Sequence, residues 1–369
     1  MEEERNWFVG VDWASEFHQA RLSDARGNKL GEQSFKHGGE GLAQLANWIL
    51  QLTAAEPDEV HIAIEVPQGP VVESLMERGF RVYAINPKQL DRFRDRFSPA
   101  GAKDDSRDAW VLCDALRTDP RCFRALRPLD PVLIELREWS RIAEELRHER
   151  NRLGNRVREL LWRYYPQLLE LTDDVAAPWY IDLWRLIPTP DKALRVREST
   201  VAKLLKRHRI RRITASQVLE KARVAAIPVA AGTIKAATSH LDAVAIRLDL
   251  VNRQIGQAEA QLDRLTGQLA DQESTDEGQE NEQRDVTILR SLPGVGRIVL
   301  ATLLAEASDA LQRRDYHALR CLSGVAPITK RSGKTRIVLM RQAVHVRLRN
   351  CVYHWARVAV QHDPRSRAK

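Results

Sequence analysis

Two long apolar repeats constrain the fold of this chain more than any other feature of its sequence. In each repeat, apolar residues recur every three or four positions, the spacing of helices that pair along a shared seam. The first comprises Val132, Leu136, Trp139, Ala143, Leu146, Leu153, Val157 and Leu160, and the second Leu241, Val244, Leu248, Val251, Ile255, Ala258, Leu262, Leu265 and Leu269. Only Arg150 interrupts the first repeat, and the second is uninterrupted. We therefore expect a coiled-coil middle with a helical insertion over residues 129–270, paired either within one chain or between two chains.

The residues before the first repeat indicate an α/β domain over residues 1–128. Short apolar runs separated by turn residues predict strands at residues 7–13, 17–23, 29–35, 60–65 and 81–85. Apolar periodicity predicts helices at residues 41–52, 69–78 and 87–97. The first three strands form an antiparallel meander, and the later strands alternate with helices, which is the pattern of an α/β layer.

Four carboxylates fall where such a domain places its active site. Asp12 and Glu65 end two of the predicted strands, and sites in these sheets form at the carboxyl ends of strands. Asp105 and Asp108 are three residues apart at the start of the next predicted helix, so they share one face of it. Converging carboxylates suit Mg²⁺. Taken alone, Asp105 and Asp108 also fit an ordinary acidic first turn.

Charge and composition favour a nucleic-acid partner. The net charge is +8, and residues 320–369 hold twelve Lys and Arg residues against one acidic residue. A polyanion is therefore the expected partner. Four scattered cysteines argue against a disulfide framework or a zinc site and fit a reducing cytosol. No apolar run is long enough for a signal peptide or a transmembrane helix, so we expect a cytoplasmic protein without a membrane partner.

Two segments between the apolar repeats and the C-terminus have unusual composition. Residues 172–240 contain the basic cluster Lys203, Lys206, Arg207, His208, Arg209, Arg211 and Arg212, with Trp179, Tyr180 and Trp184 nearby. This segment is either a solvated face or a nucleic-acid contact that combines charge with base stacking. Residues 271–285 carry seven acidic residues and one arginine without an apolar stripe, which predicts an acidic linker, assigned to residues 271–287.

The last segment, residues 288–369, is predicted to be mainly helical. Its Pro293-Gly294-Val295-Gly296 turn, followed by a predicted helix, resembles a helix-hairpin-helix module, whose glycines let backbone N–H groups approach a DNA phosphate. A second turn, Ser332-Gly333, lies within a basic loop, and a final helix is expected over residues 339–361. The candidate nucleic-acid contacts are Gly294, Gly296, Arg297, Lys330, Arg331, Lys334 and Arg336.

Taken together, these features resemble a known family. A meander followed by helix–strand repeats, with acids at positions 12, 65, 105 and 108, is similar to the RNase H-like fold of RuvC-type nucleases. With the coiled coil and the motif Gly324-Val325-Ala326-Pro327 followed by Ser332-Gly333, the chain resembles the insertion sequence 110-type family, the DEDD transposases. The resemblance covers most of the chain and is weakest over residues 172–240.

The resemblance implies a transposase or recombinase that cleaves and exchanges DNA strands. It implies that Mg²⁺ is bound by Asp12, Glu65, Asp105 and Asp108, and that Ser332 attacks the DNA backbone to form a covalent phosphoserine link. It also implies guidance by a structured bridge RNA that pairs with donor and target DNA, and assembly into dimers or tetramers.

Two departures from the family pattern leave assignments open. Asp104 stands where the family usually has a small polar residue, so it competes with Asp105 for the metal, although the spacing to Asp108 favours Asp105. No second serine adjoins Ser332, and Ser323 is a weaker rival nucleophile.

Other function classes remain open as well. One is a structure-specific nuclease of the Holliday junction resolvase type, in which water attacks the phosphodiester. Another is a non-catalytic nucleic-acid-binding scaffold. A sugar-kinase-like protein is disfavoured by the basic tail and by the missing glycine-rich phosphate loops.

Overall fold

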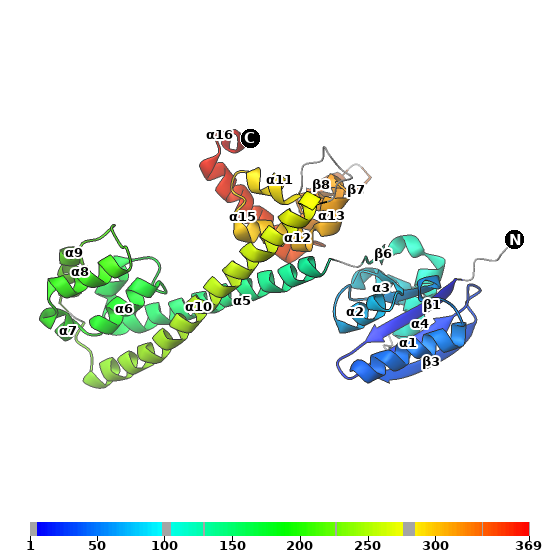
Figure 1. Ribbon diagram of the computed structural model, residues 1–369, viewed down its shortest axis with the longest axis horizontal. Helices are drawn as coiled ribbons and strands as arrows, with labels where there is room; N and C mark the ends of the chain where they lie inside the picture. Colours follow the sequence, from blue (N-terminus) through cyan, green and yellow to red (C-terminus); the bar gives the residue numbers. More distant parts are fainter. Residues whose placement is uncertain are drawn as a thin grey trace. The chain divides into compact units, whose positions relative to one another are not determined.

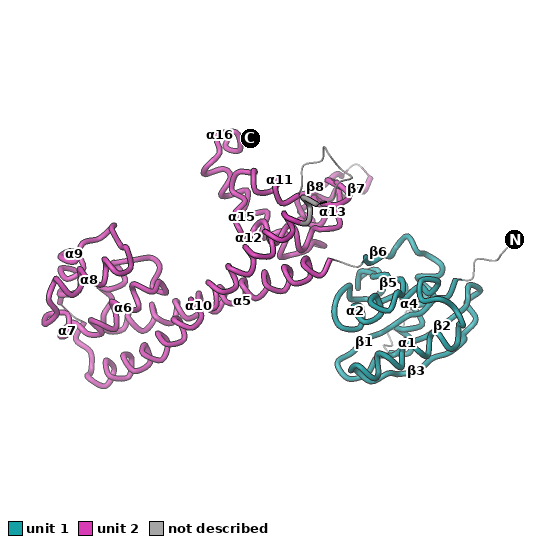
Figure 2. The backbone as a smooth tube through the Cα atoms, in the orientation of Figure 1, with its two compact units in different colours: residues 1–129 teal, residues 130–369 magenta. Residues whose placement is uncertain are grey.

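The computed structural model describes residues 6–97, 105–127, 130–225, 227–275, 285–333 and 335–368. The chain divides into two compact units, residues 1–129 and 130–369 (Figure 2). The first unit is a mixed α/β domain, and the described part of the second is helical apart from one two-stranded sheet. The predicted subdivision of the second unit into residues 129–270, 271–287 and 288–369 remains a prediction.

A sheet forms the centre of the first unit (Figure 1). It has six strands in the order β3-β2-β1-β4-β5-β6. Strand β1 is parallel to β4, and β4 is parallel to β5, whereas β2, β3 and β6 pair antiparallel with their neighbours. The strands are β1 (Trp7–Trp13), β2 (Phe17–Ser23), β3 (Lys29–Lys36), β4 (Val60–Ile64), β5 (Arg81–Ala84) and β6 (Arg124–Ala125). The α/β class predicted here is confirmed, and only the two-residue β6 was not predicted.

Helices cover both faces of this sheet. On one face, α1 (Gly39–Thr53) and α2 (Pro70–Glu77) bury leucine and valine side chains against Val9 and Val11 of β1. On the other face, α3 (Pro87–Phe97) and α4 (Asp105–Thr118) pack with Phe8 and Ala63. Because side chains alternate along a strand, Phe8, Gly10 and Asp12 all belong to the α4 face.

Gly10 lets α4 lie directly on the backbone of β1. A Cβ atom at this position would lie 2.0 Å from the carbonyl oxygen of Ala109 and 2.6 Å from the backbone nitrogen of Cys113. No larger residue fits at these distances without moving the helix. The close approach brings the first turn of α4 next to the end of β1, where Asp12 lies.

Two long helices organise the second unit, α5 (Pro131–Tyr164) and α10 (Ala231–Thr275). Glu135 pairs with Arg264 at 2.6 Å and Glu149 pairs with Arg247 at 3.4 Å, so the helices run antiparallel. Both apolar repeats contribute to the buried clusters between these helices. The repeats therefore pair within one chain, which was one of the two arrangements left open, whereas coiled-coil geometry remains a prediction.

Four short helices pack against one end of the α5–α10 pair, with which they share an apolar core (Figure 1). They are α6 (Pro178–Leu186), α7 (Pro190–Arg195), α8 (Glu198–Arg207) and α9 (Ala215–Ala222). Trp179, Tyr180 and Trp184 belong to this core and are at most 5% exposed. Base stacking by these aromatic residues, one of the two interpretations of the segment, is therefore wrong, because they fill the helical core. Six members of the basic cluster, all except His208, are exposed.

The remaining elements of the second unit are α11 (Asp285–Ser291), α12 (Arg297–Glu306), α13 (Ser308–Gln312), α14 (Tyr316–Ser323), β7 (Ile328–Ser332), β8 (Thr335–Leu339), α15 (Val346–His362) and α16 (Pro364–Arg367). The last long helix begins at Val346 rather than at residue 339, because β-branched residues precede it in β8 and the ring of His345 caps it. Of the predicted linker, residues 271–275 continue α10 and residues 285–287 begin α11, and residues 276–284 lie outside the described residues. Within the described ranges, no helix is both long and apolar enough to cross a bilayer.

Candidate active site

The sheet register places two of the predicted site carboxylates side by side. Val11 of β1 pairs with Ile64 of the parallel strand β4. The next residue of each chain segment is an acid, Asp12 in one and Glu65 in the other. Both therefore lie at the carboxyl ends of adjacent parallel strands, where α/β sheets form their sites.

The first turn of α4 supplies the other two carboxylates. Asp108 is buried, with 2% of its residue surface exposed, whereas Asp105, three residues earlier, is exposed. The structure thus brings together the four carboxylates predicted from the sequence, Asp12, Glu65, Asp105 and Asp108, which we call the acid cluster. The rival ligand Asp104 lies outside the described residues.

The pKa of Asp12 reports the electrostatics of the acid cluster. The pKa of Asp12 is raised from 3.8 to about 6, most of all by burial and then by the negative charges of Asp108, Asp105 and Glu65, in that order of size. The positive charge of Arg94 opposes this increase. Each of the other three carboxylates is therefore close enough to Asp12 to oppose its negative charge, which favours a site that gains a cation.

Asp12→Asn is expected to stabilise the metal-free protein at pH 8. The folded-state pKa is raised, so the ionised carboxylate weakens the fold above about pH 6 and this penalty disappears below about pH 4. Because Asp12 is only half-buried, solvent screening limits the gain to about 1–2 kcal/mol. Thermal unfolding in EDTA from pH 4 to pH 8 measures it. A difference between variant and parent that does not grow with pH would contradict this picture of Asp12.

Arg94 of α3 lies among these carboxylates, and sequence analysis did not single it out. Its Nε donates to Asp108 Oδ1 at 2.6 Å, and its Nη2 donates to Asp108 Oδ2 at 2.9 Å. The same Nη2 lies 3.9 Å from Glu65 Oε2, and Nη1 donates to Asp91. Burial lowers the pKa of Arg94, but the hydrogen bond and charge of Asp108 raise it above its ordinary value. The guanidinium is therefore the positive charge that balances the acid cluster in this structure.

The acid cluster has the donor chemistry of a magnesium site, although its side chains are not arranged as a finished metal cage. Among the described residues, no group of three or more His, Cys, Asp or Glu side chains is close enough to hold a metal ion. The donors are nevertheless all hard carboxylate oxygens, and Asp12 shows that their combined negative charge is unfavourable. That chemistry fits Mg²⁺, which takes few protein carboxylates and keeps several water ligands.

Ser332 lies in the second unit, at the end of β7. It pairs with Thr335 across an antiparallel hairpin formed with β8, and Gly333 in the turn has φ +54°, a conformation that favours glycine. Sequence analysis predicted this turn but not the flanking strands. The side chains of Lys330, Arg331, Ser332 and Arg336 are all exposed, and Lys334 lies outside the described residues.

The hairpin places two positive charges opposite each other. Arg331 and Arg336 are direct partners in the β7–β8 ladder. Like charges at such positions destabilise a hairpin, and neither guanidinium pairs with a described carboxylate. Lys330 and Ser332 project from the opposite face, since side chains alternate along a strand. This arrangement favours an anionic partner around the turn that carries Ser332.

The rival serine, Ser323, has a structural role. It is buried at the C-terminal end of α14, and its hydroxyl donates to the backbone oxygen of Leu319 at 2.8 Å. A hydroxyl that is buried and already donates to the helix backbone is poorly placed to attack DNA.

The Pro293–Gly296 turn packs against α15. Trp355 donates its indole N–H to the Pro293 oxygen at 2.8 Å. Gly294 has φ +80°, and a Cβ there would lie 2.9 Å from the backbone nitrogen of Ala359. By contrast, Gly296 has open space around it. Arg297, another predicted DNA contact, pairs with Asp263 at 2.6 Å and Glu259 at 2.9 Å, and its role in DNA binding remains a prediction.

Gly294→Ala is therefore expected to lower the free energy of unfolding by about 2–3 kcal/mol, because the new methyl group meets backbone atoms at a positive φ. Gly296→Ala is the matched control and should cost less than about 1 kcal/mol. Denaturant unfolding of both variants measures the difference. Equal stability of the two variants would show that Gly294 is not needed for packing.

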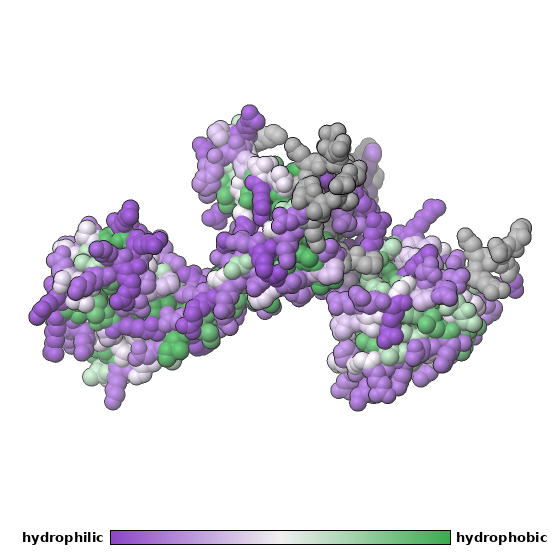
Figure 3. Space-filling view, viewed as in Figure 1, coloured by the Kyte–Doolittle hydropathy of each residue, from purple (hydrophilic) through white to green (hydrophobic). Residues whose placement is uncertain are grey.

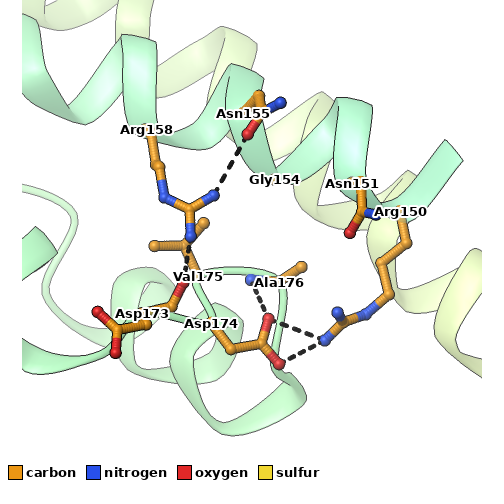
Figure 4. Close-up of a pocket in the computed structure, with 9 residues that line it drawn as sticks. All are labelled: Arg150, Asn151, Gly154, Asn155, Arg158, Asp173, Asp174, Val175 and Ala176. Carbon is orange, nitrogen blue, oxygen red and sulfur yellow. Dashed lines mark hydrogen bonds and ion pairs between the residues drawn. The ribbon is translucent and has the colours of Figure 1, made fainter. Parts of the chain in front are cut away.

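A cavity of about 430 Å³ in the second unit is lined by residues of α5 and of the loop before α6, among them Arg150 and Arg158 (Figure 4). Its arginines already have partners. Arg150 donates to Asp174 at 2.7 and 2.9 Å and to Asn252 at 2.8 Å, and Arg158 donates to the backbone oxygen of Asp173. Arg150 thus interrupts the first apolar repeat because it ties α5 to α10 and to the loop before α6.

Two family models and a relative over nearly the full length match this chain. A transposase family model, the DEDD type of IS110, matches residues 9–166, and a model of the transposase IS116/IS110/IS902 family matches residues 286–369. The mini-circle putative transposase for IS117 of Streptomyces coelicolor is 30% identical over 367 residues, which cover 98% of this chain and 86% of that protein. The chain belongs to this transposase family. The family predicted from the sequence is confirmed.

Other members of the family match to different extents. Putative transposase y4uE of Sinorhizobium fredii is 66% identical over 210 residues, which span 57% of this chain and 58% of that protein's length. The insertion element IS116 uncharacterized 44.8 kDa protein of Streptomyces clavuligerus is 26% identical over 371 residues. The first family model contains all four members of the acid cluster, and the second contains Ser332.

Proposed function

We propose that this protein is a transposase that cleaves and exchanges DNA strands through a covalent phosphoserine intermediate in the presence of Mg²⁺. The observation that carries the proposal is the convergence of four carboxylates, which come from β1, from the end of β4 and from the first turn of α4, around Asp12. An exposed serine on a basic hairpin supports the second part of the proposal.

In this proposal Asp12, Glu65, Asp105 and Asp108 hold Mg²⁺. A bound ion would supply Lewis-acid stabilisation of the phosphoryl oxygens during transfer. The role of the four carboxylates would be to hold that ion. Of these four proposed ligands, Asp108 is buried, on a helix that rests directly on β1 at Gly10.

Ser332 is the proposed nucleophile. Its oxygen forms a bond to phosphorus as the bond from phosphorus to one deoxyribose oxygen breaks, and the freed strand end takes up a proton equivalent to the one that the serine loses. Lys330, Arg331 and Arg336 flank the turn, Lys334 follows Gly333 in the sequence, and these four residues would offset the negative charge of the phosphate. A later attack by another strand end on the phosphoserine restores the serine and completes the exchange.

The acids and the serine belong to different compact units, so we propose a composite site. The serine reaches the phosphodiester either from the same chain or from a second copy. The proposed partners are donor DNA, target DNA, a structured guide RNA and further copies of the chain in a dimer or tetramer. Exposed positive charge supports polyanionic partners, and hydrophilic side chains cover most of the face seen in Figure 3. Binding should weaken steeply with salt.

A strand-exchange assay tests the proposal. Donor plasmid with the gene's own flanking DNA, target plasmid and RNA transcribed from the flank are incubated with protein and Mg²⁺. Asp108→Asn should abolish recombinant product. Asp114→Asn is the matched control on the same helix, because Asp114 pairs with Arg117 at 2.5 Å, and it should remain active. Recombinant product from a folded Asp108→Asn protein would exclude the proposed site.

A further inference from the structure

A guanidinium lies within the acid cluster, beside its buried member Asp108. Arg94 holds both oxygens of Asp108, one through Nε and the other through Nη2, in a bidentate pair. The same group lies 3.9 Å from Glu65. Arg94 thus contacts carboxylates from two of the three elements that build the acid cluster.

Burial makes this pair important for the metal-free protein. The side chain of Asp108 is 2% exposed and that of Arg94 is 19% exposed. A buried carboxylate without a counter-charge is strongly unfavourable, whereas a bidentate arginine satisfies its charge and its hydrogen bonds together. Arg94 is therefore the group that satisfies both buried oxygens of Asp108 while no metal is bound.

The same contact opposes metal binding. Both Asp108 oxygens already accept from Arg94, and a divalent ion beside Asp108 would meet a fixed positive charge within a few ångströms. Asp91 offers the guanidinium a second carboxylate on its own helix, α3, through Nη1. Arg94 therefore has a carboxylate to which it can stay bound when it leaves Asp108.

We propose that Arg94 is a resident counter-cation, a positioning residue that keeps Asp108 in place without metal and must release it when Mg²⁺ binds. This inference rests on the proposed function, because it takes the acid cluster to be the metal site. Metal binding is then an exchange in which Mg²⁺ replaces the guanidinium of Arg94. The measured Mg²⁺ affinity of the acid cluster is therefore lower than it would be without Arg94.

Arg94→Gln tests the exchange in the full-length protein. The variant should bind Mg²⁺ at least about tenfold more tightly in calorimetric titration, which corresponds to about 1.4 kcal/mol. In EDTA it should unfold at a lower temperature than the parent, and saturating Mg²⁺ should restore most of the loss. Arg94→Lys keeps a charge but not the bidentate geometry, so its Mg²⁺ affinity should fall between those of the parent and Arg94→Gln.

Arg96→Gln is the matched control. Arg96 lies two residues along the same helix, is exposed, and pairs with Asp119 at 3.6 Å. It should change neither the Mg²⁺ affinity nor the effect of Mg²⁺ on thermal unfolding. Unchanged or weaker Mg²⁺ binding by folded Arg94→Gln protein would overturn the inference, since a merely structural arginine cannot tighten metal binding when it is removed.

A second measurement needs no variant and so does not depend on folding of Arg94→Gln. Phenylglyoxal modifies free guanidinium groups, and peptide mass spectrometry reports the rate at each arginine. Mg²⁺ should increase modification at Arg94 several-fold and leave Arg96 unchanged. A rate at Arg94 that stays constant or falls with Mg²⁺ would contradict release from Asp108.

The two ideas fail in different ways. If Mg²⁺ binding is unaffected by Asp12→Asn and Asp108→Asn, the acid cluster is not the metal site and the proposed function fails. If both variants lose Mg²⁺ binding while Arg94→Gln does not gain it, the metal site stands and only the role of Arg94 is excluded.

Discussion

Replacing Ser332 with alanine is expected to reduce DNA strand exchange by at least about 1,000-fold, because the proposed mechanism has no other nucleophile. The side chain is exposed at the end of β7, so its loss should leave folding and DNA binding unchanged. The strand-exchange assay, together with a DNA-binding measurement at the same salt concentration, separates loss of chemistry from loss of affinity.

Ser323→Ala is the matched control for this prediction. Its hydroxyl is buried and donates to the Leu319 oxygen, so removing it should lower the free energy of unfolding by about 1 kcal/mol. The rate of strand exchange should change little. If Ser332→Ala exchanges strands at more than a tenth of the parent rate, Ser332 is excluded as the nucleophile. A water-dependent nuclease of the junction-resolving kind would then be the better account.

Gly10→Ala should produce the largest loss of stability, more than about 3 kcal/mol. The added methyl group would lie 2.0 Å from the Ala109 oxygen and 2.9 Å from Leu112 Cβ, so α4 must move away from β1. Because α4 carries Asp105 and Asp108, the same shift should weaken Mg²⁺ binding. Chemical unfolding and calorimetric Mg²⁺ titration measure the two effects.

Gly39→Ala, in the first turn of α1, provides the comparison. A Cβ at Gly39 meets nothing within 4 Å, and alanine favours a helix, so this variant should be as stable as the parent or more so. If Gly10→Ala behaves like Gly39→Ala, the close contact between α4 and β1 does not hold the acid cluster together.

Much of the first unit is predictable from local sequence. Apolar alternation and turn residues define β1 to β5, and the two acids at strand ends become neighbours once β1 and β4 are parallel. The position of Arg94 is not predictable in this way. It lies on a helix rich in charged residues, and only the tertiary structure shows that its partner is 14 residues away, on α4.

The second unit shows other limits of sequence analysis. Apolar repeats predict α5 and α10, but pairing within one chain depends on contacts between residues more than a hundred positions apart. The β7–β8 hairpin has exposed residues on both faces, so it lacks the alternation that identifies a half-buried strand. Composition also left the role of Trp179 and Trp184 open, because an aromatic residue beside basic residues can stack on a base or fill a core.

The central claim is that the acid cluster of the first unit and Ser332 of the second act on the same phosphodiester. The most direct test is to stop the reaction with denaturant, digest protein and DNA, and locate nucleotide-modified peptides by mass spectrometry. The account predicts a nucleotide on the peptide that contains Ser332, formed only with Mg²⁺ and absent with Asp108→Asn. DNA cleavage without a modified serine, or the same adduct in EDTA, would contradict it.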